Sequence, residues 1–144
     1  MDIVFLAKSK PKETIREHTD RLLENYNLIR SFYGKNYLHM NERMWQLLKW
    51  AVEYHDVGKA ETHFQNRLRK ALNMPLLPQK MDCSIPHNFL SVVLIPYFQL
   101  DLSEDEIRLL VQAVGYHHER ATILDREFKD NMREIIREDI MPRI

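Results

Sequence analysis

The chain has 144 residues, with 21 basic and 21 acidic side chains, so its formal net charge is zero. This length suits one domain with its own core, and the 44% hydrophobic content argues against a disordered chain. The neutral balance excludes nucleic-acid binding by bulk positive charge, and the single cysteine excludes both a disulfide framework and a cysteine-ligated zinc finger.

The beginning of the chain predicts two helices in succession. Thr14 and Glu17 form a capping box, because a hydroxyl and a carboxylate three residues apart satisfy free N–H groups of a first turn. Apolar residues then recur at helical spacing as far as Gly34, which suits a helix end. Asn41 can cap a second helix, which we expect to end near Gly58.

The middle of the chain predicts a helix, a loop and another helix. Residues 62–72 read as a third, more polar helix. Residues 73–86 contain three prolines and are predicted to form a loop, long enough to suggest a function. Pro86 suits the first turn of a fourth helix, which Pro96 should bend or end.

Two further helices complete a predicted all-α fold of about six helices, in one domain covering residues 1–144. Ser103 and Glu106 form a capping box for the fifth helix, and Asp125 can cap the sixth. The sixth has an apolar face that we expect to be core, or otherwise a surface for a partner, and its members are Phe128, Met132, Ile135, Ile136 and Ile140.

Five of the seven histidines come from four predicted helices whose side chains can converge on one point. A carboxylate next to a histidine can bridge two cations, and imidazole with carboxylate suits divalent ions such as zinc, iron, nickel, manganese or cobalt. A lone histidine is more often packed or solvated than a ligand, so the set carries the argument, and we assign no role to His39 and His63. The candidate metal ligands are His18, His55, Asp56, His87, His117 and His118.

Four segments resemble a known family. Residues 54–60, followed by Phe64 and Gln65, resemble the motif of HD-superfamily metal phosphohydrolases, and more closely the HD nuclease domain of the CRISPR type I interference nuclease–helicase. The resemblance spans roughly residues 10 to 120. The other segments that carry it are Glu17-His18-Thr19, Pro86-His87-Asn88-Phe89 and Val114-Gly115-Tyr116-His117-His118.

The resemblance implies a compact HD-domain helical bundle that degrades single-stranded DNA, both endo- and exonucleolytically, with one or two divalent ions (manganese, nickel, cobalt, iron or magnesium). It implies a helicase subunit or domain and an RNA-guided CRISPR surveillance complex as partners. The family's ligand pattern, transferred residue by residue, implies that one ion is held by His18, His55 and Asp56, with Asp56 bridging. The second ion would be held by His87, His117 and His118.

Two further residues are assigned by position. Lys59 lies three residues beyond Asp56, so it can contact the non-bridging oxygens of a phosphate and is counted with Asp56 as catalytic. Ser91 lies four residues after His87 and shares its helix face, which predicts support of a ligand or contact with a phosphate. An ordinary solvated lysine is the plainer interpretation of Lys59.

One departure from the family pattern concerns a late aspartate, which usually closes the first metal site. Asp125, Asp130 and Asp139 are available, but none stands in a matching pattern. Either Asp125, Asp130 or water fills the position, or, as we expect, the chain is a fragment or a minimal domain with a weak or empty first metal position. No apolar run approaches the roughly 20 residues of a membrane span, and no signal-peptide layout is present, so we expect a cytoplasmic protein without membrane contact.

The basic residues are dispersed, which makes DNA contact a weaker hypothesis. Phe64 or Tyr116 could stack on a base. The basic residues that could contact a phosphate backbone are Arg67, Arg69, Lys70, Lys80 and Arg120. Two alternatives to the nuclease stay open. The first is a nucleotide or cyclic-nucleotide phosphohydrolase on the same fold, and the second is an inactive fragment that binds metal and acts as an interaction module.

Overall fold

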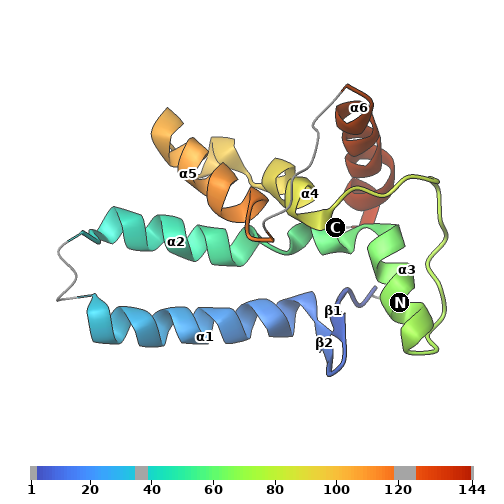
Figure 1. Ribbon diagram of the computed structural model, residues 1–144, viewed down its shortest axis with the longest axis horizontal. Coiled ribbons are helices and arrows are strands. Elements are labelled where there is room, and N and C mark those ends of the chain that lie inside the picture. The colour runs from blue at the N-terminus through green and yellow to red at the C-terminus, as the bar shows by residue number, and fades with distance from the viewer. Residues whose placement is uncertain (1–2, 35–38, 119–125, 144) are drawn as a thin grey trace.

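The computed structural model describes residues 3–34, 39–118 and 126–143, and it is mostly helical. Figure 1 shows α1 (Ile15–Tyr33) and α2 (Glu42–Tyr54) lying side by side. The capping box of Thr14 with Glu17 and the Asn41 cap both form, as predicted. The second helix ends earlier than expected, because the 3₁₀ turn η1 (Val57–Ala60) replaces its last turn.

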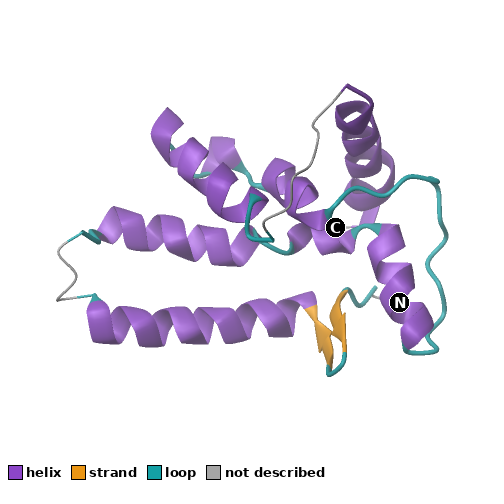
Figure 2. Ribbon diagram, viewed as in Figure 1, coloured by secondary structure: helices purple, strands orange, loops and turns teal. Residues whose placement is uncertain are grey.

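Beyond η1 the chain builds the rest of the bundle (Figure 2). After α3 (Thr62–Ala71), the predicted loop leads into α4 (His87–Leu94), which Pro86 precedes and which ends before Pro96. The 3₁₀ turn η2 (Tyr97–Gln99) leads to α5 (Glu104–Gly115), whose Ser103–Glu106 capping box also forms. None of the described helices is long and apolar enough to cross a membrane.

The last segment packs inward. The α6 helix (Arg126–Glu134) continues into the π-helical η3 (Ile135–Ile140) and the 3₁₀ turn η4 (Met141–Arg143). Ile135 and Ile140 are buried beside Leu90 of α4, and Met132 and Ile136 pack against the same cluster. The prediction of a core face is therefore confirmed for these four residues. The Phe128 side chain and the predicted cap Asp125 lie outside the described residues.

A short β-hairpin before α1 was not predicted. Strands β1 (Leu6–Ser9) and β2 (Lys12–Thr14) pair antiparallel. The fully buried Gln65 of α3 holds this hairpin to η1: its amide accepts a hydrogen bond from the Leu6 N–H at 2.8 Å and donates to the Leu6 carbonyl at 2.9 Å and the Lys59 carbonyl at 2.6 Å. The hairpin is thereby fixed beside the turn that follows α2.

Candidate metal centre

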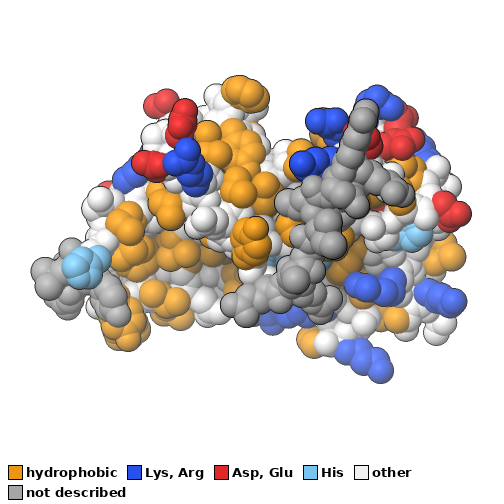
Figure 3. Space-filling view, turned by 45° about the horizontal axis from the view of Figure 1, so that its top comes forward, with side chains coloured by type: hydrophobic (Ala, Val, Ile, Leu, Met, Phe, Trp, Pro, Cys, Tyr) orange, Lys and Arg blue, Asp and Glu red, His pale blue; other side chains and the backbone are white. Residues whose placement is uncertain are grey.

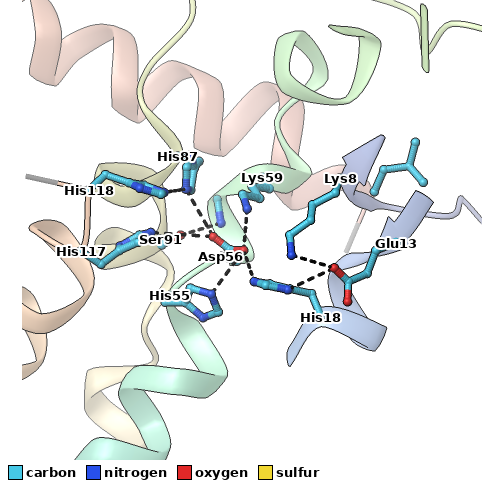
Figure 4. Close-up of polar contacts among 12 residues, drawn as sticks. Lys8, Glu13, His18, His55, Asp56, Lys59, His87, Ser91, His117 and His118 are labelled. Carbon is cyan, nitrogen blue, oxygen red and sulfur yellow. Dashed lines mark hydrogen bonds and ion pairs between the residues drawn. The ribbon is translucent and has the colours of Figure 1, made fainter. Parts of the chain in front are cut away.

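The carboxylate of Asp56 lies at the centre of the histidine cluster, in the turn between α2 and η1, and is 2% exposed. Its Oδ2 atom is 3.4 Å from His18 Nε2 and 3.3 Å from His55 Nε2. Its Oδ1 atom is 3.3 Å from His87 Nε2 and 3.8 Å from His117 Nε2. Figure 4 shows these imidazoles directed at the one carboxylate from different parts of the bundle.

The ligand atoms fall into two groups, each with its atoms within 4.8 Å of one another. The first contains His18, His55 and Asp56, and the second contains Asp56 with His87, His117 and His118. His118 Nε2 is 3.1 Å from His87 Nε2, which closes the second group. The structure thus brings all six predicted ligands together, and Asp56 belongs to both groups. His39 and His63, to which no role was assigned, are in neither.

Backbone carbonyls turn two of the imidazoles toward Asp56. His55 Nδ1 is 2.7 Å from the Val52 carbonyl oxygen, and His117 Nδ1 is 2.5 Å from that of Val114. Because a carbonyl oxygen only accepts, Nδ1 carries the proton in each ring and Nε2 presents a lone pair. Those lone pairs face a carboxylate, an arrangement that a shared cation stabilises.

Unsatisfied polar atoms give a test of whether a metal fits. Asp56 Oδ1 and His117 Nε2 are buried and have no hydrogen-bond partner, although buried polar atoms normally have one. Both atoms belong to the second group, and both are ligand atoms of the kind that divalent first-row ions prefer. The residues therefore fit a bound divalent ion.

Glu13 of the hairpin contacts the side of the His18 ring opposite Asp56, and nothing in the sequence predicted this contact. Its side chain is buried, with Oε2 3.3 Å from His18 Nδ1 and 3.2 Å from Lys8 Nζ (Figure 4). Arg21 pairs with Oε1 of the same carboxylate. A carboxylate at Nδ1 holds a ring in place and makes its other nitrogen a better metal ligand. The contact depends on the hairpin, so only prediction of the hairpin would have revealed it.

The electrostatics of the cluster favour the neutral form of three imidazoles and the ionised form of the carboxylate. Burial lowers the pKa of His18, His117 and His118, and the nearby Asp56 charge offsets only part of that effect. Burial disfavours ionisation of Asp56, but its close contacts with His55, His87 and Lys59 outweigh that effect, so its pKa lies far below the ordinary value. Neutral imidazole and ionised carboxylate are the forms that bind metals.

Lys59 and Ser91 both contact the turn that carries Asp56. Lys59 is buried, and its Nζ donates to Asp56 Oδ2 at 2.6 Å, so the plainer interpretation of a solvated lysine is wrong. The fully buried Ser91 accepts a hydrogen bond from the Gly58 N–H at 2.8 Å through its Oγ. Asn88, also buried, donates to the Gly115 carbonyl and so holds α4 against the end of α5.

The described late aspartates lie outside both groups. Asp130 is exposed on α6, with Arg133 Nη1 at 3.2 Å. Asp139 is buried and accepts from the Thr62 N–H at 2.8 Å and from the Thr62 hydroxyl, while Arg143 lies 2.7 Å away. Asp139 therefore anchors the C-terminal segment to α3. Asp125, the other candidate, lies outside the described residues.

The predicted basic residues differ in their surroundings. Arg69 is buried and donates to the carbonyl oxygens of Val4 and Pro75, which makes it a structural residue. Lys80 donates to the Glu138 carbonyl, and Arg67 and Lys70 are exposed on α3. Arg120 lies outside the described residues. Figure 3 shows Lys and Arg side chains around the end of the molecule that carries α3.

A family model described as "Cas3, HD domain" matches residues 6–140. The match includes strand β1 and most of the C-terminal helical segment, which lie outside the range over which the sequence resemblance was seen. No curated protein and no solved structure matches the chain significantly.

Proposed function

The chain belongs to the Cas3 HD domain family, and we propose on that basis that it is a metal-dependent nuclease that cleaves single-stranded DNA in CRISPR interference, both endo- and exonucleolytically. The observation that carries the proposal is the Asp56 carboxylate, which directs one oxygen toward each of two groups of imidazoles. A centre of this kind suits hydrolysis of a phosphodiester, whose charge must be neutralised while water attacks.

The six residues divide between two cation positions in this proposal. His18 and His55 hold the first with Asp56, and His87, His117 and His118 hold the second with Asp56. Divalent ions held there activate water and stabilise charge on the phosphate, and manganese, nickel, cobalt, iron and magnesium are the candidates.

Lys59 and Ser91 support the centre in different ways. The buried ammonium of Lys59 fixes one Asp56 oxygen and can shift its hydrogen bond to a non-bridging oxygen of a bound phosphate. Ser91 does not need to contact the substrate, because its hydroxyl holds the Gly58 N–H and with it the turn before Lys59.

The charge of the chain favours delivery of the substrate by partners. A chain with zero formal net charge attracts DNA weakly on its own. We propose that a helicase subunit or domain and an RNA-guided surveillance complex supply the displaced single strand in the cytoplasm.

Circular single-stranded DNA incubated with manganese, nickel, cobalt or magnesium tests the activity. The wild type should linearise and then degrade the circle, and end-labelled linear strands should report the exonuclease activity. Asp56→Asn should reduce cleavage by at least about 100-fold, because both cation positions lose their shared carboxylate. Asp130→Asn is the matched control, since this aspartate is exposed on α6 and should leave cleavage unchanged. Normal cleavage by Asp56→Asn would show that the assigned centre is wrong.

A small-nucleotide phosphohydrolase is the second candidate, favoured by a cavity of about 650 Å³ beside His87 and His118. Cyclic nucleotides and nucleoside triphosphates, supplied with the same ions, test it directly. If the protein binds metal but hydrolyses neither these compounds nor DNA, the interaction module remains.

A further inference from the structure

A cavity of about 650 Å³ adjoins the second cation position. Its walls come from α3 and from the start of α4, and His87 and His118 line it as well. Its volume of about 650 Å³ lies within the range of small-molecule pockets, about 300–1,000 Å³. A phosphodiester held at the metal centre would therefore have room beside it for an adjoining nucleotide.

The cavity wall carries a cation on an aromatic ring. Arg67 and Phe64 both line the cavity, and the Arg67 Cζ atom lies 5.0 Å from the centroid of the Phe64 ring. Arg67 is exposed and forms no ion pair of 4.0 Å or less with a carboxylate of the described residues. Arg69, two positions along, is buried and donates through both of its Nη atoms to backbone carbonyl oxygens. The guanidinium of Arg67 is thus free to take an anion from solution.

The same ring connects this arginine with the metal centre. Lys59 Nζ lies 5.5 Å from the Phe64 centroid, and the His87 ring meets Phe64 edge-on at 5.5 Å. One aromatic side chain therefore separates the lysine that holds Asp56 from the arginine at the cavity. Two cations spaced by a flat apolar surface match the alternation of phosphates and bases in a nucleic-acid strand.

We propose that this cavity is a nucleotide subsite, in which Arg67 binds the phosphate next to the scissile one and the intervening base lies against Phe64 and the guanidinium. The inference rests on the proposed function, because it assumes a phosphodiester at the metal centre. A base and a phosphate could also belong to a free nucleotide, so the test includes both forms.

The test compares Arg67→Gln, Arg67→Lys and the control Lys70→Gln. Lys70 is exposed on the same helix and was among the residues predicted to follow a phosphate backbone, but it does not line the cavity and therefore lies outside the proposed subsite. Binding of a short single-stranded oligothymidine to the metal-free wild-type chain is measured by fluorescence anisotropy at several salt concentrations. Arg67→Gln should weaken binding about tenfold. It should also make the negative slope of log K against log salt shallower by about 0.7, the value for one phosphate contact on a single strand. Arg67→Lys should restore the salt slope, and Lys70→Gln should resemble the wild type.

Cleavage assays separate failure of this inference from failure of the nuclease. With manganese, Arg67→Gln should raise KM for the oligonucleotide and leave hydrolysis of bis(p-nitrophenyl) phosphate, which has no second phosphate, unchanged. If the wild type cleaves DNA but Arg67→Gln matches it in KM and salt slope, the subsite is refuted and the nuclease stands. If wild type and variants cleave nothing, the nuclease itself fails. If Lys70→Gln lost as much affinity for the oligonucleotide as Arg67→Gln, the effect would be one of general charge. If thymidine monophosphate bound as tightly as the strand, the cavity would be a pocket for a free nucleotide. Either result overturns the strand subsite.

Discussion

Replacing Gly58 by alanine should damage the metal centre, because this glycine lies directly on the backbone of α4. A Cβ atom at Gly58 would lie 2.1 Å from the His87 carbonyl oxygen and 2.7 Å from the Ser91 backbone nitrogen, whereas ordinary contacts begin at 3.4 Å. The turn and α4 must therefore separate by about 1 Å or more. Asp56 sits on the turn and His87 on α4, so the 3.3 Å contact between them opens.

Two contributions set the size of the destabilisation. Overpacking of a core costs about 1–3 kcal/mol, and the hydrogen bond from the Gly58 N–H to the buried Ser91 hydroxyl, if broken, costs about 1–3 kcal/mol more. The free energy of unfolding should fall by about 2–6 kcal/mol, or roughly 10 °C in Tm. A misplacement of about 1 Å should also reduce DNA cleavage by about 100-fold at a temperature where the variant stays folded.

Chemical denaturation, metal analysis and cleavage of circular single-stranded DNA measure these effects together. Gly115→Ala is the matched control, since it too is a buried glycine of the bundle, but its added Cβ would meet only the Val92 side chain at 3.3 Å. That variant should change the free energy of unfolding by less than about 1 kcal/mol. A Gly58→Ala protein as stable and as active as Gly115→Ala would refute the argument that the turn must touch α4.

Three further predictions concern the surroundings of the centre. Glu13→Gln should lower the affinity of the first cation position about tenfold and leave that of the second unchanged, because only His18 loses its carboxylate partner. Isothermal titration with manganese should resolve the two affinities, and an equal fall in both would contradict the prediction. Asp139→Asn should lower the free energy of unfolding by about 3 kcal/mol, since Arg143 loses its buried partner, and it should leave the metal content unchanged. Loss of a bound ion in this variant would show that Asp139 is a metal ligand instead. The metal-free protein should lose stability as pH falls below about 6.5. Burial lowers the pKa of His18 and His117 in the folded state, so the unfolded chain takes up protons at a higher pH and is favoured as pH falls. Denaturation curves that coincide at about pH 8 and about pH 5.5 would contradict this.

The helices were predictable because their determinants are local. Thr14 with Glu17 and Ser103 with Glu106 are capping boxes within a single turn, and both form as predicted. The hairpin was missed because its strands have four and three residues, too few for alternation to show. Its position depends on Gln65, whose partner Leu6 lies 59 residues away in sequence.

The histidines of the centre were predictable from their motifs, but the groups that hold them were not. His55 and Asp56 are adjacent, and both orient through contacts within a few residues. Glu13 reaches His18 only because the hairpin folds back, and Asp139 finds Thr62 across 77 residues. Tertiary packing decides which of several carboxylates becomes buried. The sequence alone therefore could not show that Asp139 is buried against Thr62 while Asp130 is exposed.

The composition of the centre bears on how a neutral chain can act on DNA. Among the described residues, Asp56 is the one carboxylate in either group of ligands, and the other members are imidazoles. Two divalent ions bound as proposed would set four positive charges against this one negative charge, in a buried place where water screens poorly. With such ions bound, a phosphodiester would be a favourable further ligand, and its binding and that of the ions would strengthen one another by linkage. Zero net charge in the chain is thus compatible with strong local attraction for a phosphate, confined to the centre where cleavage takes place.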